Sequence, residues 1–186
     1  MAKLNNIILC ILGKSGCGKT TVAERLHTAY GFEVLNSYTT RKPRYDGEEG
    51  HIFVDKQTFD ELTNKVAYTN FNGNEYCVTK EQVDNADIYI IDVAGLKKLK
   101  ELYKGKEIVA LYIDVPMETC LERMRERGES EDTCWSRLRH DEEAFRGVHG
   151  LVDYTVNGIP NDTWLQIVSI INRHLMYKSH FHYGKE

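Results

Sequence analysis

The segment GKSGCGKT, residues 13–20, stands between an apolar run and a helical pattern. It fits the spacing G-x-x-x-x-G-K-[ST], in which glycines let successive backbone N–H groups curl around an oxyanion. Ile7–Leu12 before it are typical of a buried strand, and residues 20–30 after it repeat apolar side chains at helical spacing until Gly31. The segment therefore predicts a strand–loop–helix unit that binds the phosphates of a nucleoside triphosphate.

The side chains of this loop have separate expected roles. Lys19 is expected to reach the β and γ phosphates, and the hydroxyl of Thr20 is a candidate ligand of Mg²⁺. A GTPase would also carry an N/T-K-x-D motif late in the chain, and this sequence has none. The residues expected to bind the phosphates of the triphosphate are Gly13, Ser15, Gly16, Gly18, Lys19, Thr20 and Thr21.

The composition is that of an ordinary globular domain. The 186 residues are 41% hydrophobic and 28% charged, which is enough apolar material for a core. A net charge of −4 argues against a broad nucleic-acid-binding face, and no apolar run is long enough for a membrane span. The five cysteines show neither paired nor zinc-type spacing, which favours reduced thiols. We expect a cytoplasmic monomer or homodimer that binds neither nucleic acid nor membrane.

Apolar runs alternate with helical patterns along the chain, which predicts a parallel α/β sheet. Thr79 is followed by Gln82 at capping-box spacing, so a helix is expected to begin there. Asp92 ends one apolar run, at the edge where open α/β sheets bind ligands; a metal-binding carboxylate and a simple helix cap are both open readings. Further strands are expected at 32–35, 87–92, 108–114 and 153–156, and further helices from Pro116 and after a cap at Asn161.

Two polar stretches interrupt this alternation. The first begins with SYTTRKPR, residues 37–44, where the guanidinium groups of Arg41 and Arg44 suit a phosphate ligand. The second, residues 123–146, is rich in arginine and suits a mobile lid that places positive charge on a transferred phosphoryl group. A solvated charged loop and ion pairs with neighbouring glutamates are the alternative readings.

The motifs together resemble those of the guanylate kinases. They are the phosphate loop, SYTTRKPR, GEEGHIFVDKQTF, NGNEY, IDVAG, RERG and SRL, and they cover almost the whole chain. The resemblance implies an ATP- and Mg²⁺-dependent nucleoside-monophosphate kinase with a three-layer α/β P-loop fold and a five-stranded parallel sheet. It also implies a core at 1–36, 80–122 and 147–178, an acceptor-binding lobe at 37–79, a lid at 123–146 and a flexible tail at 179–186.

The resemblance assigns roles to residues at matching positions. Lys19, Arg127 and Arg137 would be the catalytic cations on the transferred phosphoryl group, and Asn157 would lie near the adenine of ATP. Asp92 would lie near the sugar of the acceptor or bind Mg²⁺ through water. The residues that would bind the acceptor are Ser37, Arg41, Arg44, His51, Tyr76 and Asp92.

Three positions differ from the pattern of that family. His51 stands where a tyrosine is usual, and the positions that read guanine fall at Ala67 and Val78. GMP or dGMP is the acceptor that the family implies, but the base stays open. The same pattern also resembles the phosphokinases that act on phosphosugars such as ribose 1,5-bisphosphate. A non-catalytic guanylate-kinase-like binding module is a third reading, although the intact Lys19 and Thr20 speak against it.

Overall fold

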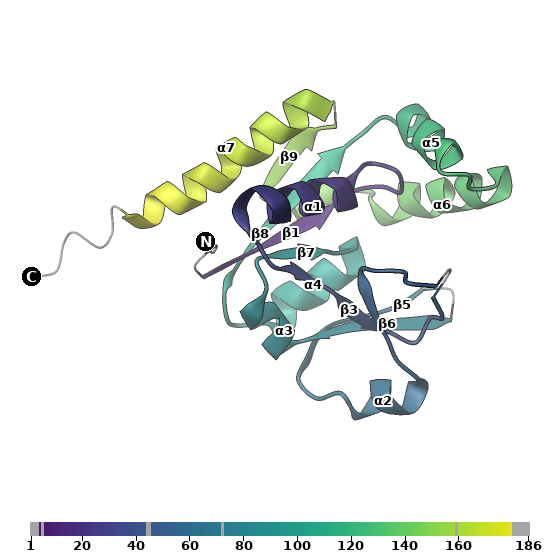
Figure 1. Ribbon diagram of the computed structural model, residues 1–186, viewed down its shortest axis with the longest axis horizontal. Helices are drawn as coiled ribbons and strands as arrows, with labels where there is room; N and C mark the ends of the chain where they lie inside the picture. Colours follow the sequence, from purple (N-terminus) through teal and green to yellow (C-terminus); the bar gives the residue numbers. More distant parts are fainter. Residues whose placement is uncertain (1–3, 5, 44–45, 72, 159, 180–186) are drawn as a thin grey trace, which may run out of the picture. The chain divides into compact units, whose positions relative to one another are not determined.

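The computed structural model describes residue 4 and residues 6–43, 46–71, 73–158 and 160–179. Its core is a five-stranded parallel sheet with the strand order β2-β7-β1-β8-β9, which confirms the predicted α/β fold (Figure 1). Every strand predicted for this sheet is present, although two of them are shorter than expected. The strands are β1 (Ile7–Leu12), β2 (Val34–Leu35), β7 (Ile88–Ile90), β8 (Glu107–Asp114) and β9 (Tyr154–Asn157).

Four of the helices that the structure describes lie where the sequence predicts them, namely after residue 19, at Thr79, at Pro116 and near Asn161, and three others were not predicted. Among the residues described, the helices are α1 (Lys19–Tyr30), α2 (Lys56–Glu61), α3 (Lys80–Asn85), α4 (Val93–Leu102), α5 (Met117–Glu126), α6 (Glu131–Ala144) and α7 (Pro160–Ser179). The chain forms two compact units, one of Met1–Leu12 and Ala23–Ala110 and the other of Gly13–Val22 and Leu111–Glu186. The phosphate loop thus belongs to the second unit, and the SYTTRKPR segment belongs to the first.

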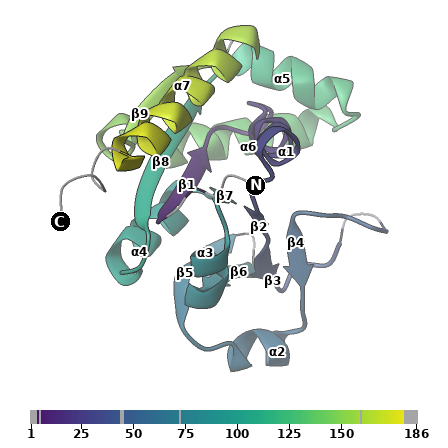
Figure 2. The same cartoon turned by 60° about the vertical axis from the view of Figure 1, so that its left-hand side comes forward.

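The first unit contains a second sheet that the sequence did not predict. Its strands are β3 (Ser37–Thr39), β4 (His51–Phe53), β5 (Lys65–Phe71) and β6 (Asn74–Thr79), in the order β4-β3-β6-β5. Figure 2 shows α2 at one end of this sheet, on the connection from β4 to β5. β5 and β6 form an antiparallel hairpin, whereas β3 pairs with β4 in parallel. The polar stretch therefore forms a small sheet rather than an irregular loop.

Local signals set the helix boundaries in the first unit. Thr79 and Gln82 form both bonds of the capping box at the start of α3, as predicted. Asp92 caps α4 by accepting a hydrogen bond from the backbone N–H of Gly95. Gly31 has a φ of 71°, and its N–H donates to the carbonyl of His27, which ends α1. The helix-cap reading of Asp92 is therefore confirmed.

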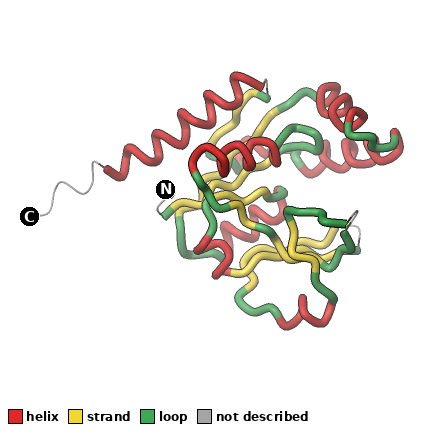
Figure 3. The backbone as a smooth tube through the Cα atoms, in the orientation of Figure 1, coloured by secondary structure: helices red, strands yellow, loops and turns green. Residues whose placement is uncertain are grey.

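In the second unit, β8 pairs in parallel with β9, and α7 packs against β9. Figure 3 shows α5 and α6 as two helices joined by a short loop, residues 127–130. α7 begins at Pro160, so the predicted cap at Asn161 is wrong. Proline suits the first position of a helix, because its fixed φ is helical and its missing N–H would have had no partner there.

The remaining general expectations concern thiols and membranes. All five cysteines are free thiols with buried side chains. Burial raises the pKa of Cys77 and of Cys120 to about 11, so both stay protonated at neutral pH. Among the helices that the structure describes, none combines the length and the hydropathy that crossing a bilayer requires.

Candidate active site: a phosphate loop and an acceptor pocket

The phosphate loop is closed by its own lysine. The ammonium of Lys19 donates to the carbonyl oxygens of Gly13, at 2.6 Å, and Lys14, at 3.0 Å. Gly16 has a φ of 81°, and a Cβ atom there would lie 2.5 Å from the carbonyl oxygen of Cys120. A side chain at this position would therefore be strained and would collide with the backbone of α5. Glycine is needed at this point of the loop for both reasons.

Helix α6 contacts the loop at Ser15. The Nε atom of Arg137 donates to the hydroxyl of Ser15 at 3.2 Å, and the backbone N–H of Ser15 donates to the carboxylate of Asp141 at 2.6 Å. From α5, the Nη1 atom of Arg123 donates to the carbonyl oxygen of Cys17 at 3.2 Å. The predicted lid arginine Arg137 is thus brought to the loop. Arg123 belongs to the predicted arginine-rich stretch but had no assigned role, and Asp141 was not predicted, because its neighbours are typical of a solvated helix face.

Glu129 holds both predicted catalytic arginines. One carboxylate oxygen lies 2.9 Å from Nη2 of Arg127, and the other lies 2.7 Å from Nη1 of Arg137. The side chain of Arg127 is 56% exposed and that of Arg137 is 35% exposed, so neither guanidinium is locked in a core. The predicted ion pairing with a neighbouring glutamate is therefore present for these two arginines. Exposed ion pairs contribute little stability, so a phosphate could replace Glu129 as their partner.

The other predicted ATP-binding residues lie on exposed parts of the second unit. Thr20 and Thr21 are in the first turn of α1 and have exposed side chains. Asn157 is the last residue of β9, and its carbonyl oxygen accepts a hydrogen bond from Thr163 at 2.6 Å. Its side chain is exposed. That this side chain lies near the adenine of ATP stays a prediction.

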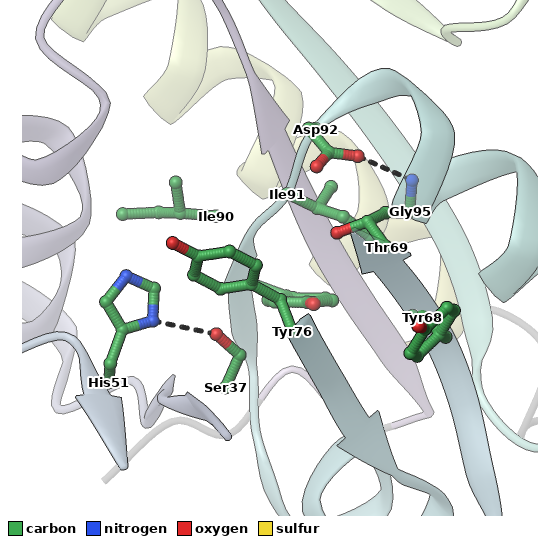
Figure 4. Close-up of a pocket in the computed structure, with 11 residues that line it drawn as sticks. Ser37, His51, Tyr68, Thr69, Tyr76, Ile90, Ile91, Asp92 and Gly95 are labelled. Atoms are coloured by element: carbon green, nitrogen blue, oxygen red, sulfur yellow. Dashed lines mark hydrogen bonds between the residues drawn. The ribbon is translucent and has the colours of Figure 1, made fainter. Parts of the chain in front are cut away.

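The first unit contains a pocket of about 190 Å³ that collects four of the six predicted acceptor residues, as Figure 4 shows. These four are Ser37, His51, Tyr76 and Asp92, and the pocket wall also includes Ala67, Tyr68, Thr69, Tyr89, Ile90, Ile91 and Gly95. The wall residues come from the small sheet, from β7, from the segment that connects β7 to α4, and from the first turn of α4. The small sheet therefore builds a pocket beside the end of β7.

Polar groups form part of the wall of this pocket. A hydrogen bond of 2.9 Å joins the hydroxyl of Ser37 to Nδ1 of His51, and the rings of His51 and Tyr76 have centroids 5.6 Å apart. Burial raises the pKa of Tyr89 well above its usual value, with the charge of Asp92 adding to the effect. The hydroxyl of Tyr89 is therefore protonated at neutral pH and can act as a hydrogen-bond donor.

Arg41 is held in place but keeps an unused donor. Its Nη1 and Nη2 atoms donate to the two carboxylate oxygens of Glu48 at 3.0 and 2.8 Å, and its guanidinium lies 5.2 Å from the ring centroid of Phe53. The hydrogen bond to Glu48 raises the pKa of Arg41. Its buried Nε atom has no hydrogen-bond partner within the described residues, and an oxygen of a bound phosphate would supply one. Arg44, its predicted companion, lies outside the described residues.

A glycine-rich loop between a buried strand and a helix, with arginines nearby on helices, defines a P-loop nucleotide-binding domain. In agreement, residues 9–146 match the family model described as "AAA domain". The chain is 32% identical over 180 residues to the guanylate kinase of Clostridium acetobutylicum, an alignment that covers 89% of this chain and 83% of that protein. It is 33% identical over 186 residues to the guanylate kinase of Anaeromyxobacter dehalogenans, covering 91% and 81% respectively. The chain belongs to the guanylate kinase family.

A solved structure supports the same fold. The guanylate kinase of Anaplasma phagocytophilum superposes with a TM-score of 0.67 at 24% identity, over 92% of this chain and 86% of that one. The family that the motifs suggested is therefore confirmed by sequence, and its fold is confirmed by structure.

Proposed function

We propose that the protein transfers the γ-phosphoryl group of ATP to the phosphate of GMP. The observation that carries this proposal is the contact between Arg137 of α6 and Ser15 of an intact phosphate loop. An arginine in this position adds positive charge beside the loop that would hold the triphosphate. Phosphoryl transfer needs little covalent help from the protein, and depends on such charge and on alignment.

The second unit supplies the ATP half of this proposal. Lys19 would exchange the carbonyl oxygens of Gly13 and Lys14 for the β and γ phosphates of ATP. Arg137 and Arg127 would leave Glu129 and bind the moving phosphoryl group, because a phosphate carries more charge than one carboxylate. Glu129 would thus hold the arginines ready between turnovers.

The first unit supplies the acceptor half. Ser37, His51 and Tyr76 would bind the phosphate of GMP, and the buried Nε of Arg41 would gain a phosphate oxygen as its partner. We include Arg44 in this set by its place in the SYTTRKPR motif. The phosphate of a nucleoside monophosphate is already an anion near neutral pH, so the reaction needs no general base to activate it.

Mg²⁺ fits the donor atoms that the chain offers. Mg²⁺ prefers oxygen ligands and takes few of them from the protein when substrate phosphates are present. The hydroxyl of Thr20 would bind it, and the carboxylate of Asp92 would do so through water. When bound, the ion neutralises charge on the phosphates.

The proposal includes a cytoplasmic location, because five free buried thiols suit a reducing compartment. Whether the protein is a monomer or a homodimer stays a prediction.

An assay of ADP release with Mg·ATP tests this function. The acceptors to compare are the ribo- and deoxyribonucleoside monophosphates and ribose 1,5-bisphosphate. We expect turnover with GMP or dGMP and none with the phosphosugar, because the matching relatives are guanylate kinases. The same relatives disfavour a non-catalytic binding module. Turnover with ribose 1,5-bisphosphate but with no nucleotide would overturn the proposal.

A further inference from the structure

Asp141 is a buried carboxylate that the chemistry proposed above does not use. Its residue is 9% exposed, although it lies in α6 among strongly polar neighbours. One carboxylate oxygen accepts the backbone N–H of Ser15 at 2.6 Å. Burying a carboxylate is costly unless hydrogen bonds compensate it. The contact with the phosphate loop is therefore a strong interaction of this carboxylate and a reason for its buried position.

α6 contacts Ser15 through two side chains of opposite charge. Arg137 donates to the hydroxyl of Ser15, and Asp141, four residues later, accepts its N–H. Residues four apart lie on the same face of a helix, so one face of α6 binds both the side chain and the backbone of Ser15. Hydrogen bonds to charged groups are roughly twice as strong as neutral ones. This pair of contacts would fix the conformation of the loop at Ser15.

Other polar groups of the loop are also satisfied from within the protein. The ammonium of Lys19 donates to the carbonyl oxygens of Gly13 and Lys14, and the N–H of Cys17 donates to the carbonyl oxygen of Lys14. A phosphate loop binds its ligand through backbone N–H groups and its lysine. A bound triphosphate would accept hydrogen bonds from the ammonium of Lys19 and from backbone N–H groups of the loop. In this conformation, oxygens of the protein accept hydrogen bonds from such groups instead.

We propose that Asp141 is a positioning residue that holds the phosphate loop in a nucleotide-free conformation and must release Ser15 when ATP binds. The inference rests on the proposed use of this loop as the ATP site. The N–H of Ser15 cannot donate fully to a carboxylate and to a phosphate together, and the charge of Asp141 repels the triphosphate. Asp141 therefore lowers the affinity for ATP, while Arg137 stays on the same helix to bind the phosphates.

Calorimetric titration of the full-length protein with Mg·ATP, in the absence of any acceptor, tests this proposal. Asp141→Asn keeps the shape and removes the charge, and we expect it to bind ATP about tenfold more tightly than the wild type, since a charge-assisted bond is replaced by a neutral one. Asp141→Glu keeps the charge and should stay closer to the wild type. Glu142→Gln, an exposed neighbour with the same change in net charge, is the matched control and should leave the affinity unchanged. Equal or weaker ATP binding by Asp141→Asn would overturn the proposal.

The amide resonance of Ser15 provides a second readout that needs no ATP. In the nucleotide-free protein, the Ser15 amide should exchange with solvent more slowly in the wild type than in Asp141→Asn, and Glu142→Gln should match the wild type. An unchanged Ser15 amide in Asp141→Asn would refute the role of Asp141 even if the protein is a kinase. A changed amide in a protein that binds no ATP would instead count against the proposed function. GMP binding to each variant checks that it is folded.

Discussion

The Nε atom of Arg137 lies 3.2 Å from the hydroxyl oxygen of Ser15, so an arginine of the predicted lid segment, residues 123–146, contacts the phosphate loop. Arg137 also donates to Glu129, and it is thereby held beside the loop by a partner on each side. This arrangement is what a cation would need in order to reach a phosphoryl group during transfer.

Arg137→Ala should lower kcat by about a thousandfold, the size of effect that a transition-state arginine has in phosphoryl transfer. The KM for GMP should change little, because the lost charge acts on the transferred group. Arg139→Ala is the matched control, since Arg139 is exposed on the same helix and should keep normal kcat. A loss confined to the KM for ATP would show that Arg137 binds ATP without aiding the transfer.

Lys19→Ala should reduce turnover by a factor of about a hundred to a thousand, because the phosphates lose a fixed positive charge. The measurement is steady-state ADP release at saturating ATP and GMP. Lys97→Ala removes an exposed lysine of α4 and should leave the rate unchanged. Preserved turnover in Lys19→Ala would contradict the proposed mechanism.

Arg41→Ala should raise the KM for the acceptor by about ten- to a hundredfold, the range expected when a charged hydrogen bond is lost. The KM for ATP should change far less. Lys42→Ala removes the neighbouring exposed cation and serves as the control. Equal increases in both KM values would mean that Arg41 acts on the fold rather than on the acceptor phosphate.

Asp92 has a confirmed role as a helix cap and a proposed role at the substrate, and two substitutions separate them. Asn caps helices as well as Asp does, so Asp92→Asn should keep the thermal stability and lower the activity through the lost charge. Asp92→Ala should lose both the activity and about 1 kcal/mol of unfolding free energy. Full activity in Asp92→Asn would show that Asp92 serves only as a helix cap and has no role at the substrate.

The acceptor pocket should discriminate weakly between GMP and IMP, which differ by the 2-amino group of the base. Within the described residues, Asp92 is the carboxylate of the pocket wall, and one of its oxygens already accepts from Gly95. Ala67 offers a methyl group and Thr69 a hydroxyl, so the part of the wall that the structure describes has no second carboxylate for the amino group. We expect kcat/KM for the two acceptors to agree within about tenfold, since strong discrimination requires a dedicated buried partner. A preference for GMP above about a thousandfold would contradict this view of the pocket.

Local sequence signals predicted the parts of the fold that depend on neighbouring residues. The apolar run Ile7–Leu12 forms β1 with both ends as expected, and the capping box at Thr79 starts α3. The small sheet was not predicted. β3 and β4 have three residues each, too few to show an alternation of polar and apolar side chains. They form because β3 pairs with both β4 and β6, which are distant in the sequence.

Local sequence signals also predict only part of the candidate site. Ser37, His51, Tyr76 and Asp92 could be named from motifs and do line one pocket. Asp141 could not be named, because the segment RHDEEAF is typical of a solvated helix face. Its burial depends on the contact with Ser15, more than a hundred residues earlier in the chain. Such pairings across the chain are visible only in three dimensions.

Following the γ-phosphate of labelled ATP in the presence of Mg²⁺ and GMP shows whether the protein transfers this group to GMP. We expect the label to appear as the β-phosphate of GDP with the wild-type protein, and to appear there about a hundred to a thousand times more slowly with Lys19→Ala. Label that stays in ATP with the wild-type protein, or that is released only as inorganic phosphate, would contradict the proposed transfer.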